Sequence, residues 1–188
     1  MKKLSDQQII ESVRDGNQSD YSIIVDRYKN KAFSLLNRML RNEQDAEETL
    51  QDCFLKAYKS LNSFKGEAKF STWFYRIVYN TALTKLSSKK RKIENEMSSV
   101  DEHFDLKSDY DYNVSERKDM SEFINELVNK LPKKHSAIIS LFYLDEMSYE
   151  EISKVLDISI SNVKVMLHRS RNALRNLIIE KNLVKELI

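Results

Sequence analysis

The chain has 188 residues, of which 41% are apolar and 10% aromatic, so it can build one full domain or two small hydrophobic cores. Its single cysteine, Cys53, excludes an internal disulfide, and no apolar run approaches the roughly 20 residues that a membrane-spanning helix requires. The polar start of the chain also lacks the apolar segment of a secretion signal, so we expect a cytoplasmic protein without a membrane span.

The net charge of +2 hides an uneven distribution of charged residues. Residues 1–92 carry 18 Lys/Arg and 11 Asp/Glu, residues 93–119 carry 3 and 9, and residues 120–188 carry 10 and 9. The three segments therefore have net charges of +7, −6 and +1. This pattern predicts a basic domain over 1–92, a flexible acidic linker over 93–119 and a second domain over 120–188.

Only two glycines and one proline interrupt the chain, which favours an all-α fold of two small helical domains over a fold rich in strands and tight turns. In the first of four predicted N-terminal helices, Ser5 and Gln8 form a capping-box pattern, and Gly16 can end the helix. Apolar residues then recur every three or four positions over 21–39, which predicts a second helix with one face in a core.

A third apolar stripe over 46–61 has charged and amide side chains on its opposite side. The stretch 62–69 contains a glycine and reads as a loop. Ser71 or Thr72 can cap a fourth helix, which is expected to run to about Leu86. These four helices form the predicted N-terminal domain.

Apolar periodicity returns at Met120, in a helix that ends at Pro132, and this proline can open the next helix. Ser148 and Glu151 then form a second capping box. A short break separates that helix from a last, longer apolar stripe. The segment 148–177 thus has the layout of a helix-turn-helix.

The charge of this last segment indicates nucleic-acid binding. Residues 158–179 contain no acidic residue, and their basic residues and histidine are Lys164, His168, Arg169, Arg171 and Arg175. Such a surface attracts phosphates, and the first turn of the second helix would reach base edges. The alternative interpretation is a solvated pair of helices in an ordinary bundle.

Aromatic and basic residues alternate over 64–92. The aromatic set is Phe64, Phe70, Trp73, Phe74, Tyr75 and Tyr79. Bases stack on such rings at roughly 1–3 kcal/mol each while cations follow the backbone, which favours single-stranded nucleic acid. Because Phe74, Ile77 and Val78 share one side of a helix, we assign them to packing and expect only part of the set to meet DNA.

Three blocks of sequence carry a family resemblance: DAEETLQDCFLKAY at 45–58, FSTWFYRI at 70–77 with Asn80, and SYEEI at 148–152 with Val163, Lys164 and LHR at 167–169. In this order and spacing they resemble bacterial sigma factors of the extracytoplasmic-function (ECF) group. The resemblance implies a two-domain protein, without a catalytic site or cofactor, that binds core RNA polymerase, directs it to promoters and helps to open the duplex.

The resemblance implies that one row of side chains docks on the clamp helices of the polymerase largest subunit, while the second domain meets the flap region. This row is Asp45, Glu48, Gln51 and Asp52. A solvated helix face is the alternative for such a row, since exposed charges contribute little alone. The resemblance also implies an anti-sigma partner.

The resemblance implies further that the loop 62–69 captures a flipped base of the non-template strand at the −10 element, and that Asn80 reads the promoter. Basic residues downstream would hold the DNA backbone. The full −10 set is Asn62, Phe64, Lys65, Lys69, Trp73, Arg76, Asn80, Lys85, Lys89, Lys90 and Arg91. Extraction of a base costs a few kcal/mol, which ring and phosphate contacts must return.

The −35 element is assigned to the last helix and the turn before it. This set is Ser159, Ser161, Asn162, Lys164, Val165, Met166, His168 and Arg169. Val165 and Met166 stand where the family often has a small polar residue and an arginine. They can touch thymine methyls but cannot bind guanine in a bidentate way, so a different −35 sequence is expected. Asp157 replaces a common glycine and tolerates the left-handed backbone of the turn. Cys53 replaces a common valine and reads as a small buried hydrophobe.

Two alternatives concern the whole protein. The second function hypothesis is a polymerase-independent helix-turn-helix regulator, which would not need the block 45–58. An enzyme is disfavoured because His103, His135 and His168 lie in separate segments and no phosphate-binding glycine loop is present.

The acidic stretch 94–119 either occupies a polymerase channel or is a solvated spacer. The free chain, with two tethered domains, is expected to bind promoter DNA weakly.

Overall fold

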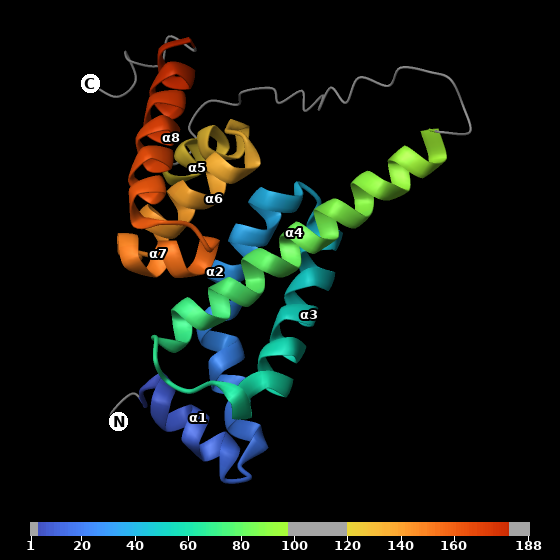
Figure 1. Ribbon diagram of the computed structural model, residues 1–188, viewed down its shortest axis with the longest axis vertical. Helices are drawn as coiled ribbons and strands as arrows, with labels where there is room; N and C mark the ends of the chain where they lie inside the picture. The colour runs from blue at the N-terminus through green and yellow to red at the C-terminus, as the bar shows by residue number, and fades with distance from the viewer. Residues whose placement is uncertain (1–3, 98–119, 181–188) are drawn as a thin grey trace.

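A computed structural model describes residues 4–97 and 120–180, which form helices joined by short loops and include no strand (Figure 1). The all-α prediction is therefore confirmed. The N-terminal helices are α1 (Asp6–Arg14), η1 (Gln18–Asp20), α2 (Tyr21–Leu40), α3 (Glu43–Ser60), η2 (Leu61–Ser63) and α4 (Phe70–Met97). The C-terminal helices are α5 (Met120–Lys130), α6 (Lys133–Ile139), η3 (Ser140–Leu144), α7 (Tyr149–Leu156) and α8 (Ile160–Glu180).

The predicted start and end of α1 are both present. The Ser5 hydroxyl accepts a hydrogen bond from the Gln8 backbone N–H, and the Gln8 side chain accepts one from the Ser5 N–H, which completes the capping box. Gly16, just beyond the helix, has a φ of +106°, a conformation that side-chain-bearing residues rarely adopt. The apolar faces of α1, α2, α3 and α4 then close one core.

At the centre of this core, aromatic rings from three helices pack together. The Phe74 ring stacks on Phe54 with centroids 4.9 Å apart and lies 5.6 Å from Tyr28. Phe70 stacks on Phe74 at 6.0 Å. Because Phe70 and Phe74 both belong to α4, these ring contacts fix the N-terminal half of α4 against α2 and α3.

Helix α4 differs from the sequence prediction at both ends. It begins at Phe70 and continues to Met97 instead of starting at a Ser71 or Thr72 cap and ending near Leu86. Loss of apolar periodicity after Leu86 marks where the helix leaves the core, not where it stops. No glycine or proline interrupts the helix, and its lysines, arginine and glutamates have high helix propensity. In Figure 1 its C-terminal half projects past α3.

The C-terminal domain contains the predicted helix-turn-helix. The Ser148 and Glu151 capping box is present at α7. Asp157 follows α7 in a left-handed conformation, with φ of 56°, so the turn forms without a glycine. Val163 and Leu167 on α8 are buried in the domain core, as the last apolar stripe predicts. Leu174 and Leu177 pack against that core while partly buried.

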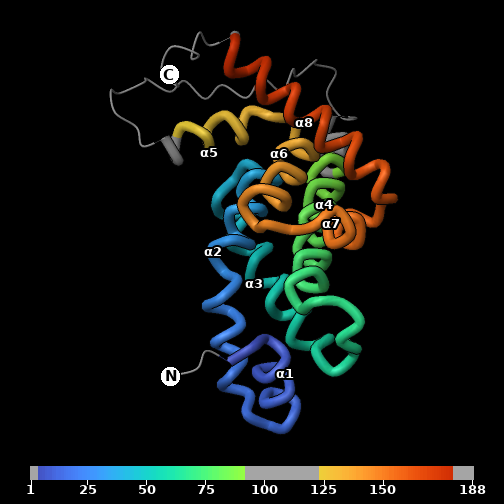
Figure 2. Tube along the Cα trace, turned by 90° about the vertical axis from the view of Figure 1, so that its left-hand side faces the viewer, coloured from blue at the N-terminus to red at the C-terminus, as the bar shows by residue number. Residues whose placement is uncertain are grey.

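The two domains also pack directly against each other. Helix α7 lies beside α4, and α6 lies beside α2, in both views (Figures 1 and 2). Between them, the buried Arg38 guanidinium donates hydrogen bonds to the Ser140 hydroxyl at 3.2 Å and the Asn125 amide oxygen at 2.6 Å. The Tyr75 hydroxyl donates to the Asp145 carboxylate at 2.7 Å. The sequence predicted two tethered domains, and none of these contacts is readable from it.

The acidic residues 98–119, with His103, lie outside the described part of the chain, so both interpretations of the linker stay open. In the described ranges, 4–97 and 120–180, no helix combines the length and hydropathy that crossing a lipid bilayer would demand.

Candidate functional site

The loop before α4 is held in place by an arginine at the end of α1. Arg14 at the end of α1 donates hydrogen bonds to the carbonyl oxygens of Leu61, at 2.6 Å, and of Phe64. The Phe64 ring is only 6% exposed and packs against Phe70 and Trp73, with centroids 5.8 and 5.1 Å away. The Phe64 side chain thus anchors the loop in the core and leaves its ring little surface for a flipped base, so its −10 role stays a prediction.

A groove of about 500 Å³ lies between α3 and α4. It brings together three residues of the predicted −10 set, Trp73, Arg76 and Asn80. Sequence reasoning missed the other lining residues, which are Lys56, Ser60, Ile77, Thr81 and Thr84. The groove thus has an aromatic ring, an aliphatic side chain, two cations, an amide and hydroxyl groups.

These groups match the chemistry of a nucleotide. A half-buried indole offers a stacking face, an amide can pair with a base edge, and the cations can meet phosphate oxygens. Lys56 donates to the Thr81 hydroxyl at 3.2 Å, which links the two walls of the groove. Lys56 stands on the polar side of α3, but only the packing of α3 on α4 places it beside Asn80.

Most of the aromatic residues over 64–92 belong to the core. Phe64, Phe70, Phe74, Tyr75 and Tyr79 are buried, and Trp73 is the half-buried member that lines the groove. Burial thus leaves only part of the set accessible, and which of these rings meets DNA stays a prediction. Ile77, which the periodicity assigned to packing, is half-buried and also contributes to the groove.

The predicted polymerase-docking row lies along α3. Glu48, Gln51 and Asp52 are exposed, whereas Asp45 is only 9% exposed. Leu55, which sequence reasoning did not select, is 56% exposed three residues after Asp52 and four after Gln51. An apolar side chain on the polar side of a helix was the available signal, since such an anchor is typical of protein interfaces.

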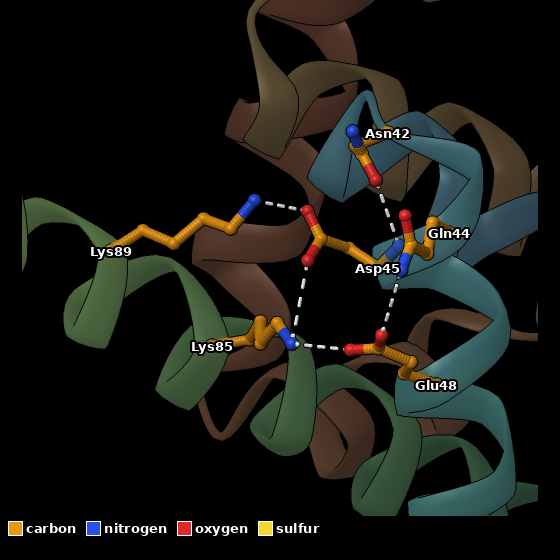
Figure 3. A network of polar contacts seen from close by, with 6 residues as sticks. All are labelled: Asn42, Gln44, Asp45, Glu48, Lys85 and Lys89. Carbon is orange, nitrogen blue, oxygen red and sulfur yellow. Dashed lines mark hydrogen bonds and ion pairs between the residues drawn. The ribbon is translucent and has the colours of Figure 1, made fainter.

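Asp45 is the centre of an ion-pair network that joins α3 to α4 (Figure 3). Its carboxylate accepts hydrogen bonds from the Lys89 ammonium and from Lys85, the latter at 3.3 Å. Lys85 also bonds Glu48 at 3.0 Å. The hydrogen bond from Lys89 lowers the pKa of Asp45, and the one to Glu48 raises the pKa of Lys85.

The beginning of α3 holds this network in position. Asn42 caps the helix, its amide oxygen accepting from the Asp45 backbone N–H at 2.8 Å, and Gln44 donates to Glu48 at 3.3 Å. Docking acids and DNA-binding lysines, predicted as two sites, thus form one network. Asp45 is not an open docking group here, and Lys85 and Lys89 are engaged by α3.

Two more cations of the −10 set contact the second domain. Lys69 pairs with Glu151 at 2.9 Å, and Arg76, on the edge of the groove, lies 3.5 Å from Asp157. Asn62 and Lys65 are exposed on the loop side of α4, and Lys90 and Arg91 are exposed along its outer part. The −10 set therefore extends along α4 but does not gather in a single pocket.

The predicted −35 set lies at the start of α8. Ser159 caps this helix, its hydroxyl accepting from the Asn162 backbone N–H at 3.2 Å. Six members of the set are exposed within the helix, namely Ser161, Asn162, Lys164, Val165, His168 and Arg169. Met166 is half-buried and packs against the core, so it has less surface for a base than predicted.

Cys53 is fully buried, and burial raises the pKa of its thiol to about 11, as suits a small hydrophobe. Across residues 4–97 and 120–180, no three His, Cys, Asp or Glu side chains gather in a way that would hold a metal ion. The side chains at the groove and at the start of α8 thus provide polar, cationic and aromatic groups.

Comparison with known proteins connects these surfaces to a family. The family model described as Sigma-70 region 2 matches residues 24–92, and the model described as Sigma-70, region 4 matches residues 124–174. The groove and the docking row lie within the first match, and the start of α8 within the second.

Curated relatives cover nearly the whole chain. The ECF RNA polymerase sigma-E factor of Haemophilus influenzae is 31% identical over 93% of this chain and 96% of its own length. The ECF RNA polymerase sigma factor SigW of Bacillus subtilis is 36% identical over 88% and 92%. The sigma factor RpoE of Bartonella quintana, solved with the anti-sigma factor NepR, has the same fold, with a TM-score of 0.65 and 21% identity over 85% of this chain and 96% of that one. With both sigma regions in order and relatives matched over almost their full length, this chain belongs to the ECF group of RNA polymerase sigma factors.

Proposed function

We propose that this chain binds core RNA polymerase, directs it to specific promoters and assists opening of the duplex. The observation that carries the proposal is the groove between α3 and α4, in which a half-exposed indole, an amide and cations face solvent beside a polar helix face. Membership of the ECF sigma group identifies RNA polymerase as the enzyme that this polar face would bind. We expect no catalytic activity of its own.

In this proposal residues 1–92 form the domain that holds polymerase and the −10 element. Gln51, Asp52 and Glu48, with Leu55 as apolar anchor, dock on the clamp helices of the largest subunit. The ordering of these side chains on a rigid helix suits a specific interface. Lys85 and Lys89 support this face through Asp45 and reach the DNA backbone only when those ion pairs exchange.

The groove would receive an unstacked base of the non-template strand. Trp73 offers a stacking face, Asn80 pairs with the base edge, and Lys56 and Arg76 meet the adjacent phosphates. The DNA backbone on either side of the groove would contact four more cations, Lys65, Lys69, Lys90 and Arg91. Asn62 would contribute to the −10 site from the loop before α4. A duplex hides the faces of its bases, so this site selects parted strands.

Residues 120–188 would read the −35 element through the first two turns of α8 and contact the flap region of the polymerase. Ser161, Asn162 and Lys164 are exposed there, with Val165 next to them. Ser159 contributes by capping the helix, and His168 and Arg169 lie one turn further along toward the phosphates. The segment 93–119 joins the domains, and α4 occupies its first residues as far as Met97.

Replacing Met166 with arginine is expected to change −35 preference toward a guanine at one position, because arginine binds guanine in a bidentate way. A good bidentate pair discriminates by about 1–3 kcal/mol, or roughly 5- to 150-fold. Binding of holoenzyme across a library of −35 sequences measures this. An unchanged preference would remove Met166 from the reading set.

The protein would work in the cytoplasm, where polymerase is. The Bartonella quintana relative was solved with an anti-sigma factor, and we propose a partner of that kind for this chain. The acidic segment 94–119 either follows a polymerase channel or acts as a spacer, and replacing its carboxylates by amides separates the two. Normal initiation by that variant would favour the spacer.

The direct test mixes the purified chain with core polymerase. Co-elution in size-exclusion chromatography, followed by promoter-specific initiation and mapping of start sites across a genome, is the expected result. The competing hypothesis, a polymerase-independent regulator, predicts duplex binding without co-elution. That outcome would contradict the proposal.

A further inference from the structure

Aromatic rings and cations form one stack on the surface of the C-terminal domain, beside the helix-turn-helix. The Phe142 and Tyr149 rings stack on each other, with centroids 5.3 Å apart and 18° between their planes. The Lys164 ammonium lies over the Tyr149 ring, 5.7 Å from its centroid. The Arg171 guanidinium lies over the Phe142 ring at 5.4 Å. The stack therefore joins η3, α7 and α8, and a cation of α8 lies at each end of it.

Arg171 has a further partner in Tyr143, the residue after Phe142. The guanidinium lies over the Tyr143 ring at 5.5 Å, and its Nε–H donates a hydrogen bond to the Tyr143 hydroxyl at 2.8 Å. Arg171 is exposed, and Tyr143 is 52% exposed. Two ring faces and one hydrogen bond thus fix the direction of a guanidinium that solvent still reaches.

The stack orients its two cations without neutralising them. Among the residues whose side chains the structure describes, neither Lys164 nor Arg171 forms an ion pair with a carboxylate. Lys69 and Arg76 of the −10 set differ in this respect, because each is paired with an acidic side chain. A guanidinium has five N–H donors and the bond to Tyr143 uses one, so the others are available to an anion. Such a preorganised cation loses little freedom when the anion binds.

The position of Arg171 on α8 favours the DNA backbone as this anion. Arg171 follows Lys164 by seven residues, two turns or about 10.5 Å along the helix, so both lie on the same side of α8. The major groove is only about 8.5 Å deep. When the first turn of α8 reaches base edges, a side chain two turns later therefore stands near the phosphates. No acidic residue over 158–179 opposes that approach.

We propose that Arg171 binds a phosphate of the DNA backbone beside the −35 element, and that Tyr143 is its positioning residue. The inference rests on the proposed function, because it concerns the same helix-turn-helix. The sequence placed Arg171 in a broad basic group and gave Tyr143 no role, whereas the stack singles out both. The DNA surface of the C-terminal domain thereby extends from α8 onto η3.

Two substitutions separate the charge of Arg171 from its position. Arg171→Gln removes the charge, whereas Tyr143→Phe keeps the ring and the charge and removes only the hydroxyl. Both side chains are exposed, so their replacement removes little core packing, and circular dichroism confirms the fold of each variant. The two substitutions together complete a double-mutant cycle. Arg175→Gln is the matched control, since Arg175 is an exposed arginine one turn further along α8.

The measurement is the affinity of the full chain for a short fluorescein-labelled DNA duplex of mixed sequence, over a range of salt. We expect Arg171→Gln to weaken binding about tenfold and to reduce the salt slope by about one, because one phosphate contact is lost. Tyr143→Phe should weaken binding about two- to fourfold without a change in slope, because the charge stays. In a chain that already carries Arg171→Gln, Tyr143→Phe should have no further effect. The control should stay within about twofold of the parent.

Three results would overturn the inference. One is a salt slope that Arg171→Gln leaves unchanged. Another is additivity of the Arg171 and Tyr143 effects, which would mean that Tyr143 acts through the packing of the domain and not through Arg171. The third is an equal loss in Arg175→Gln, which would mean that the charge of α8 counts and the stack does not.

Co-elution with core polymerase is measured on the parent chain and on Arg171→Gln. If the parent co-elutes but duplex binding does not depend on Arg171, the inference fails and the proposed function stands. If Arg171→Gln then also loses co-elution, the stack serves a protein partner instead of DNA. If the cycle gives the expected values but the parent does not co-elute, the inference is supported and the proposed function fails.

Discussion

Replacing Gln51 and Asp52 with alanine is expected to abolish stable association with core RNA polymerase while leaving the fold intact. Both side chains are exposed on α3, whose buried side is fixed by other residues, so their loss removes no core packing. Truncation of one partner in a buried, hydrogen-bonded interfacial pair typically costs about 2–5 kcal/mol. This corresponds to roughly 30-fold to several-thousand-fold weaker binding, which fluorescence titration against core enzyme measures.

A matched control lies on α2. Asp26 and Asn30 are also an exposed carboxylate and amide, four residues apart on a helix outside the docking row. Their replacement by alanine should leave polymerase binding within about twofold of the parent, since exposed side chains outside an interface contribute little. Promoter-specific initiation by a folded Gln51→Ala, Asp52→Ala chain at the parent's rate would contradict the docking assignment.

The second large effect is expected in the groove, where Asn80→Ala and Arg76→Ala should weaken promoter opening in different ways. The Asn80 amide can read a base edge, so its loss should cost about 1–3 kcal/mol at one promoter position and relax discrimination there. Arg76 meets phosphate, so its loss should weaken binding to all sequences and reduce the salt slope by about one. Holoenzyme binding to forked promoter DNA over a range of salt measures both.

Holoenzyme is required for this comparison, because in the free chain Arg76 is paired with Asp157. Asn30→Ala serves as the control, since it removes an exposed amide outside the groove. Equal sequence discrimination by the parent and Asn80→Ala would exclude Asn80 as a reading residue. A salt slope that Arg76→Ala leaves unchanged would exclude Arg76 from phosphate contact.

The structure adds a physical reason for the weak DNA binding that we expect of the free chain. The sequence suggested that two tethered domains, each with a small DNA surface, bind poorly until polymerase fixes their spacing. The contacts of Asp145, Arg38 and Glu151 indicate instead that the domains hold each other.

The sequence by itself determined most of the helices, both capping boxes and the order of the two domains. Capping boxes at Ser5 and Ser148, the left-handed Asp157 and the apolar stripe of α8 are local features, formed by residues three or four positions apart. Polar positions on α3 were readable for the same reason, and Leu55 was visible as an exception among them. The three sequence blocks that resemble ECF sigma factors indicated which residues have functional roles, which hydrophobic periodicity alone does not indicate.

Tertiary structure alone decided which of these residues meet. Phe64 turned inward because the packing of the loop on Phe70 and Trp73 gives its ring a core. Asp45 was joined to Lys89, and Tyr75 to Asp145, across 44 and 70 residues of chain. Helical periodicity says which face of a helix is buried but not which partner covers it, because that choice depends on how distant segments pack. The groove, the ion-pair network and the interface between the domains are all products of that packing.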